Sequence, residues 1–397
     1  MKEFVKMTLA TIAGLFLFGF VAFFLFFAMV GAIASIGSSQ PVMPREGVLQ
    51  INMSAMTLTE QTQEEDPFAS LAGSGSVTPV GIYSAIKAVN AAATDPAVKF
   101  IYMKPDGASG GIAQIEEFRK ALENFRNSGK AIVSYIENPS NASYYLASVS
   151  DKIYMTSYEG GMNMFSGLSS QMIFLKDLLD RLGVNVQLIR HGKYKSAGEM
   201  FVRNSSSKEN LEQNEAMVKS IWNSWTGTIS EAREISAEKF NALLNDLTLT
   251  SSEDFVTAGL ADELLSSEEL KGKLASLYGT ESSDDIKNIP FTDYVTAKKA
   301  LPSLSDKKIA VIYADGDIID GKSKDQGAGD RFAGIIAKIR KDPAVKAVVL
   351  RVNSPGGSVL ASEKIKNELD LLMESVPVVA SYGDYAASGG YWISANA

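Results

Sequence analysis

The sequence contains no cysteine and only one histidine, His191, in 397 residues. The lack of cysteine excludes disulfides, thiolate metal ligands and a cysteine nucleophile. With one histidine, a multi-histidine zinc site cannot form and a Ser-His-Asp triad has a single possible base. Acidic residues outnumber Lys and Arg by 46 to 38, and the basic residues do not cluster in a phosphate-binding pattern. We therefore expect no nucleic-acid partner, no metal and no cofactor.

Charge is also missing near the N-terminus, where no ionisable side chain occurs between Lys6 and Arg45. Residues 8–36 are apolar almost throughout, which is long enough to cross a lipid bilayer. The only candidate cleavage site, AIAS at 32–35, follows an apolar run longer than that of a signal peptide, so we favour an uncleaved anchor. Lys2 and Lys6 precede the span, which predicts a cytoplasmic N-terminus and places the rest across the membrane.

The chain repeats itself at an offset of 247 residues. DPAVK occurs at 95–99 and again at 342–346, and the match continues without a gap to 12 identities over 56 positions. Each copy alternates apolar β-type runs, small-residue turns and a helix of about fifteen residues. In the second copy we predict strands over 346–352 and 377–382, joined by a helix from Ser358 to about Glu374. This alternation predicts an α/β fold with parallel sheets.

The repeat also suggests how the chain is divided. We assign 1–44 to the cytoplasmic N-terminus and anchor, 45–300 to a first domain and 301–397 to a second. Adding the offset to the end of the first copy places the end of the second near residue 547, so we expect about 150 further residues. The Ser-, Thr-, Glu- and Gly-rich stretch from Thr57 to Thr78 is predicted to be a mobile loop.

Two small-residue turns follow the predicted strands of the second copy. Ser388 lies in YAASGGYW, at the start of a predicted helix, and NSPGG at 353–357 leaves the neighbouring strand. In a parallel sheet the ends of neighbouring strands share one edge, where sites usually form. Backbone N–H groups at such turns can stabilise an oxyanion. The alternative is an ordinary serine N-cap beside a plain turn.

These residues resemble the signal peptide peptidase A (protease IV) family, whose fold is similar to that of the Clp protease subunit and the crotonases. The resemblance rests on RVNSPGGS, on AASGGYWIS and on GKYKSA at 192–197. It implies that Ser388 is the nucleophile and Lys195 the general base. The oxyanion donors would be the N–H groups of Gly389 and of the PGG turn, with Gly356 favoured over Gly357.

A lysine base is chemically reasonable, because burial in an apolar cleft lowers the pKa of an ammonium group and populates its neutral form. The sequence leaves two rivals, His191 and Lys193, which only the family match separates from Lys195. The family usually has Glu-Pro after KSA, whereas here Glu199 precedes Met200. This departure affects the expected local backbone shape.

The first copy lacks its own nucleophile. At the 247-residue offset Asn141 stands in the place of Ser388, and residues 108–110 stand in the place of the PGG turn. We therefore expect the first domain to supply Lys195, the second to supply Ser388, and the site to form where they meet.

These observations lead to one main hypothesis and two alternatives. The main one is a membrane-anchored serine endopeptidase of the bacterial inner membrane, with its catalytic domains on the periplasmic side. It would cleave signal peptide remnants and other membrane-associated peptides, and the family resemblance implies a homo-oligomer. The alternatives are a crotonase-like acyl-thioester enzyme and a catalytically silent membrane scaffold. For the 397-residue chain alone we expect little or no activity.

Overall fold

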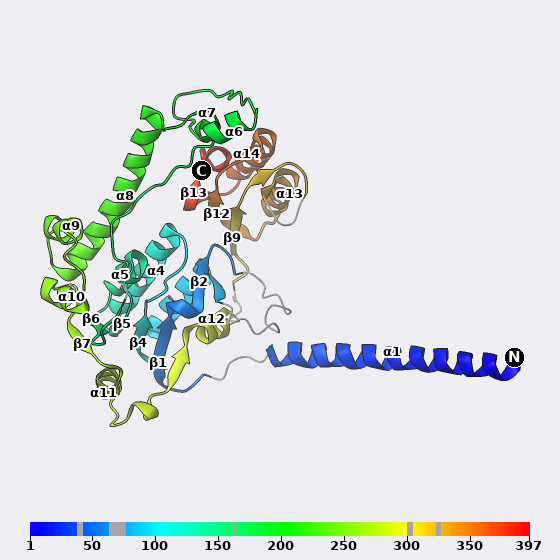
Figure 1. Cartoon of the computed structure of the whole chain (residues 1–397), viewed down its shortest axis with the longest axis horizontal. Helices are drawn as coiled ribbons and strands as arrows, with labels where there is room; N and C mark the ends of the chain where they lie inside the picture. The colour runs from blue at the N-terminus through cyan, green and yellow to red at the C-terminus, as the bar shows by residue number, and fades with distance from the viewer. Residues whose placement is uncertain (38–42, 63–76, 162, 300–304, 323–326) are drawn as a thin grey trace.

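A computed structural model describes residues 1–37, 43–62, 77–161, 163–299, 305–322 and 327–397. Helix α1 (Lys2–Gly37) projects away from the rest of the chain (Figure 1). Residues 2–27 of this helix form a segment long and apolar enough to cross a membrane, and all of them are exposed. The helix covers the segment in which the sequence predicts the anchor.

The first α/β unit is built on a six-stranded parallel sheet. Its central strands are continuous apolar runs with nearly every residue buried, as expected for a sheet covered on both faces. The predicted parallel arrangement is confirmed. The strands in spatial order are β7 (Glu263–Leu265), β6 (Lys152–Thr156), β5 (Ile132–Ile136), β4 (Val98–Lys104), β1 (Gly47–Asn52) and β8 (Asn288–Pro290).

Helices cover this sheet and extend beyond it (Figure 1). A separate two-stranded ribbon pairs β2 (Met56–Thr59) with β3 (Thr78–Gly81). The helical elements of the first unit are η1 (Met53–Ala55), α3 (Ile82–Thr94), α4 (Ile112–Arg126), α5 (Asn141–Ala147), α6 (Lys176–Arg181), α7 (Glu199–Val202), α8 (Lys208–Arg233), α9 (Ala237–Asn245), α10 (Ser252–Ala258), α11 (Ser267–Tyr278), η2 (Ser283–Asp285) and α12 (Phe291–Lys299).

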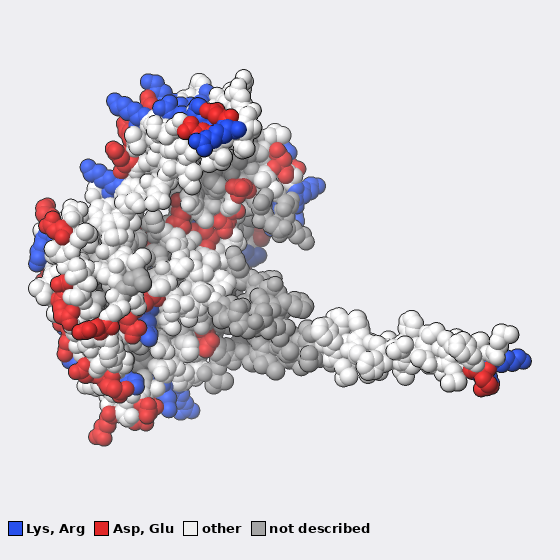
Figure 2. All heavy atoms as spheres, in the orientation of Figure 1, with Lys and Arg blue, Asp and Glu red and all other residues white. Residues whose placement is uncertain are grey.

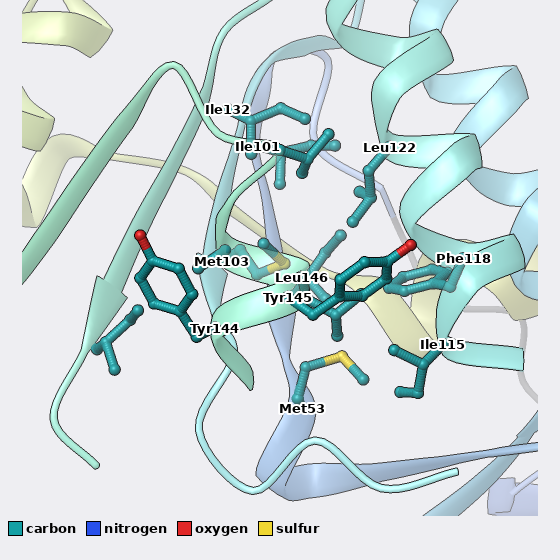
Figure 3. Packing of buried hydrophobic residues seen from close by; sticks show 14 of the residues in the cluster. Met53, Ile101, Met103, Ile115, Phe118, Leu122, Ile132, Tyr144, Tyr145 and Leu146 are labelled. Atoms are coloured by element: carbon teal, nitrogen blue, oxygen red, sulfur yellow. The ribbon is translucent and has the colours of Figure 1, made fainter. Parts of the chain in front are cut away.

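The main core of the first unit lies between the sheet and helices α3, α4 and α5. Figure 3 shows Ile101 and Ile132 of the sheet facing Phe118 and Leu122 of α4, all of them fully buried. The i, i+4 spacing of the two α4 residues places both on the face that meets the sheet. A smaller cluster on the opposite face of the sheet packs beneath α11.

The second unit has a parallel sheet in the order β13 (Val378–Ala386), β12 (Val345–Ser354) and β9 (Lys308–Asp315). It has its own hydrophobic core, which shares no buried residue with the cores of the first unit. The remaining elements are β10 (Ile318–Ile319), β11 (Gly327–Ala328), α13 (Gly329–Arg340), α14 (Val359–Met373) and α15 (Gly389–Ser394).

The structure corrects two expectations from the sequence. The predicted loop from Thr57 to Thr78 is too long at both ends, because its first three residues belong to β2 and its last residue begins β3; residues 63–76 lie outside the described part. The gapless offset also fails at one strand. Ile101 pairs with Ile132 in the first sheet, whereas its equivalent Val348 pairs with Val378, one residue short of the offset.

The two units meet around Arg351 of β12, which is 6% exposed. Its guanidinium donates to both carboxylate oxygens of Glu60, at 2.7 and 3.0 Å, and to Glu117 of α4 at 2.6 Å. Burial acts to lower the pKa of Arg351, but the ion pairs with the two glutamates outweigh it and raise the pKa. A charge buried at this depth requires such partners. Arg351 therefore ties the second sheet to the first unit.

Candidate active site

Ser388 occupies a strained turn between β13 and α15. Its backbone has φ 51° and ψ −119°, a region that residues with a Cβ rarely adopt. Gly390 makes this turn possible, because a Cβ there would lie 2.4 Å from the carbonyl oxygen of Ser354. The side chain of Ser388 is exposed at this bend. A serine on a strained strand-to-helix turn is typical of nucleophile positions in hydrolases.

The predicted oxyanion turn lies directly beside Ser388. A Cβ on Gly356, whose φ is 98°, would lie 2.5 Å from the Gly389 nitrogen and 2.8 Å from the Ser388 Cβ. The N–H of Gly356 donates to Ser354 Oγ at 3.2 Å. Within the described residues, the N–H groups of Gly357 and Gly389 have no acceptor. The hydrogen bonding therefore makes Gly357 the better candidate for the second donor, whereas the family resemblance favours Gly356.

Lys195 is brought to Ser388 from the other unit. Its Nζ lies 3.4 Å from Ser388 Oγ, within hydrogen-bond reach across 193 residues of sequence. Both side chains are exposed in the single chain. Neither His191 nor Lys193 has a polar contact with Ser388 among the described residues. Of the three bases that the sequence leaves open, the structure places only Lys195 beside the serine.

Lys195 is carried by residues 168–206, which we call the arm. The arm runs along α8 and forms α6 and α7, and it reaches the second unit at Ser388 (Figure 1). Glu199 is its only buried residue. A segment without an apolar core depends on polar contacts or on a partner for its shape.

Polar contacts around Glu199 organise the tip of the arm. The carboxylate, 1% exposed, accepts hydrogen bonds from Arg190 at 2.9 Å, from the Ser207 N–H at 3.0 Å and from Asn210 at 3.2 Å. Arg190 also donates to the carbonyl oxygen of Lys195 at 3.0 Å. Arg190 thus links the buried carboxylate of Glu199 to the backbone of Lys195.

These contacts also determine the charge state of Glu199. Burial acts to raise the pKa of Glu199, but hydrogen bonds from Ser207, Arg190 and Asn210 outweigh it and lower the pKa to about 2. The carboxylate is therefore charged at neutral pH. The sequence marks Glu199 only as the residue before Met200, where the family usually has proline, and gives no sign of its buried partners.

The segment just before the arm contacts Asn141, which the 247-residue offset aligns with Ser388. By element position the offset is one residue out here, because Ser388 is the N-cap of α15 and Ser140 is the N-cap of α5. Asn141 accepts a hydrogen bond from the Ser166 N–H at 2.9 Å and donates to the carbonyl oxygen of Gly167 at 3.4 Å. Phe165 is buried between Tyr144 and Phe255, next to this contact. Asn141 thus anchors the segment that leads to Lys195.

No group of three or more His, Asp or Glu side chains suited to a metal ion occurs in the part of the chain that the structure describes. The chemistry available at the turn is that of a serine hydroxyl, a lysine amine and backbone N–H donors. This set of groups is characteristic of serine hydrolases that use a base other than histidine.

Comparison with known proteins shows similarity to one peptidase family. Residues 124–281, which include Lys195, match Peptidase family S49. The chain is 34% identical to Protease 4 of Haemophilus influenzae over 95% of this chain and 64% of that protein. It is 38% identical to Protease 4 of Salmonella typhi, covering 70% of this chain and 46% of that protein. It is 31% identical to the chloroplastic serine protease SPPA of Arabidopsis thaliana, covering 86% of this chain and 50% of that protein.

Residues 124–281 thus match the sequence pattern of peptidase family S49, and the longer similarities are to proteins named as proteases. The chain spans between 46% and 64% of the length of these three relatives.

Proposed function

We propose that the chain is the nucleophile-bearing part of a serine endopeptidase in which Ser388 attacks and Lys195 is the general base. The observation that carries this proposal is the 3.4 Å approach of Lys195 Nζ to Ser388 Oγ at a strained turn. The family match supports a peptide substrate, since its members are described as proteases.

The chemistry follows from the positions of these groups. Lys195 accepts the hydroxyl proton as Ser388 Oγ forms a bond to the carbonyl carbon of the peptide. The N–H groups of Gly389 and Gly357 stabilise the oxyanion, with Gly356 as the third candidate. Collapse of the intermediate breaks the C–N bond, and the ammonium of Lys195 returns the proton to the leaving amine. Water then hydrolyses the acyl-enzyme by the same proton transfers.

A lysine can work as a base only where water is largely excluded. Lys195 and Ser388 are both exposed in the single chain, so the proposal requires a cover. A bound peptide supplies part of it, and a second copy of the chain can supply the rest. The arm offers a surface for such a contact, because Ile173, Leu182 and Ile189 are 70%, 67% and 95% exposed.

We propose that the arm is a contact between copies in a homo-oligomer. It carries six Lys and Arg against three Asp and Glu, whereas the chain as a whole has a net charge of −8. Figure 2 shows basic side chains gathered at the end formed by α6 and α7, and acidic ones along the opposite end of the first unit. This separation of charge suits a head-to-tail contact between identical chains.

The self-association proposal is tested by light scattering in detergent. Ile189→Asp places a charge on the arm and should shift the protein to a smaller species. Leu247→Asp, at a position 77% exposed beyond α9, is the matched control and should leave the mass unchanged. An unchanged mass for both variants, or a monomeric parent protein, would contradict an arm-mediated contact.

For location, we propose that residues 8–36 anchor the protein in the bacterial inner membrane with the catalytic part on the periplasmic side. The length and apolar character of α1 support the anchor. The sidedness rests on Lys2 and Lys6 before the span. Membrane-retained signal peptides are then the proposed substrates, because an anchored site meets them in the plane of the bilayer.

We also retain 45–300 and 301–397 as the proposed domains, which the separate sheets and cores support. The proposed site would then lie between domains, with the base from one and the nucleophile from the other.

The catalytic proposal is tested by peptide cleavage with the full-length protein in lipid vesicles. Ser388→Ala and Lys195→Ala should each reduce cleavage of a membrane-inserted signal peptide to background. Lys193→Ala and His191→Ala are matched controls and should retain activity. Cleavage that survives loss of Lys195 but not of His191 would replace the dyad with a histidine-based site.

A further inference from the structure

The second sheet carries a β-bulge that the first sheet lacks. Between β12 and β13, Val352 pairs with Tyr382, but the next registered pair joins Ser354 to Ala386. Residues 383–385 therefore stand outside the regular ladder. The equivalent strands of the first unit, β4 and β5, pair without a register shift. Bulges of this kind bend a strand and aim side chains away from the sheet.

The bulge points into the first unit. Asp384 Oδ1 accepts a hydrogen bond of 2.8 Å from the Ala113 N–H, in the first turn of α4. The first N–H groups of a helix have no intrahelical acceptor, and a carboxylate there is also favoured by the helix dipole. Asp384 thus supplies from the second unit a cap that α4 does not provide itself, since its N-cap residue is Gly111.

The absence of a side chain at Gly111 leaves the space that this carboxylate occupies. A Cβ built on it would lie 1.3 Å from Asp384 Oδ2, so any side chain would expel Asp384. The backbone does not otherwise require glycine, because φ −73° and ψ 161° suit any residue. The missing side chain therefore serves the contact between the units rather than the local turn.

The residues beside Asp384 are held just as closely. A Cβ on Gly383 would lie 2.5 Å from Glu60 Oε1, the oxygen that also receives Arg351. On the other side, the Tyr385 N–H donates to Asn353 Oδ1 at 3.1 Å. The bulge is thus fixed between the first unit and β12, three residues before Ser388.

We propose that Asp384 is a positioning residue for the reaction, and that its seat on Gly111 and the N-terminus of α4 sets where Ser388 stands relative to Lys195. Ser388 lies in the turn that directly follows the bulged strand β13, while Lys195 belongs to the unit that contains α4. A displaced bulge moves the nucleophile but leaves the arm unchanged. This inference rests on the proposed function, which supplies the pair of residues to be aligned.

The test is a double-mutant cycle in the full-length protein. Asp384→Ala and Gly111→Ala should each lower kcat about tenfold or more, with a smaller change in KM, because small misplacements of reacting groups cost this much. The double variant should be no worse than Asp384→Ala, since the added methyl then fills vacated space. Asp384→Asn keeps an acceptor for the Ala113 N–H and should recover part of kcat.

Gly272→Ala is the control for glycine replacement, because a Cβ there meets nothing within 4 Å; it should leave kcat unchanged. Effects of Gly111→Ala and Asp384→Ala that simply multiply would overturn the inference, as would full activity in either variant. A cycle that couples the two residues in stability but not in kcat would also overturn it, because the contact would then be structural only.

Failure of the proposed function is recognised separately. In that case Ser388→Ala or Lys195→Ala leaves hydrolysis intact. The stability part of the cycle can still be measured in the Ser388→Ala background, where no turnover is needed. Coupling there with no Ser388-dependent hydrolysis would refute the catalytic proposal while retaining the contact between the units.

Discussion

Replacing Ser388 by glycine should make the protein more stable than replacing it by alanine. The turn holds Ser388 at φ 51° and ψ −119°, which glycine adopts freely and alanine does not. Relief of such backbone strain is worth about 1–3 kcal/mol. Glycine also makes the unfolded chain more flexible, which costs about 0.4–1 kcal/mol relative to alanine. The balance is therefore about 1–2 kcal/mol in favour of Ser388→Gly.

Thermal unfolding of the two variants in detergent measures this difference. Each kcal/mol of added stability raises the Tm by about 2–4 °C in a domain of 150–250 residues. Ser276, exposed in α11, is the control, because glycine inside a helix is about 1 kcal/mol worse than alanine and the order should reverse. If Ser388→Ala is as stable as Ser388→Gly while Ser276 behaves as expected, the turn is not strained and the reasoning is wrong.

Three further predictions concern groups away from the nucleophile. Glu199→Gln should loosen the tip of the arm, so that limited proteolysis within 168–206 becomes faster while the Tm changes little. Because the pKa of Glu199 is lowered from 4.5 to about 2, the protection it gives is complete above pH 4.5 and is lost as pH falls toward 2; the wild type and Glu199→Gln should then be cleaved at similar rates by an acid protease. Arg351→Met should lower the free energy of unfolding by about 3–5 kcal/mol, because it leaves a buried carboxylate unpaired. Adding Glu60→Gln should recover part of that loss in a denaturant titration, and no recovery would contradict the buried ion pair.

The fold could be predicted from the sequence for identifiable reasons. Strand, turn and helix alternate with clear hydrophobic patterns, and the repeat shows the pattern twice. Ser388 and Lys195 lie in short motifs, so the resemblance to a family predicts a role for both, and that role stays a prediction. The 3.4 Å approach across 193 residues is what the structure adds.

The contacts that support the site could not be predicted in this way. Arg351 and Asp384 act through partners that are distant in sequence, and the partners of Glu199 lie 8 to 11 residues away without a regular spacing. No local pattern marks a charge as buried. The gapless repeat also concealed the bulge, because one residue is lost before β13 and two are gained within it, so the sequence alignment stays within one residue throughout. The preference for Gly357 over Gly356 likewise depends on a single hydrogen bond to Ser354.

The central claim is that Lys195 makes Ser388 nucleophilic, and covalent labelling tests it most directly. The full-length protein is treated with a serine-reactive phosphonate and the adduct is located by mass spectrometry. The account predicts one modified residue, Ser388, with labelling that falls to background in Lys195→Ala and persists in Lys193→Ala. An adduct on another residue, or equal labelling of Ser388 without Lys195, would contradict it.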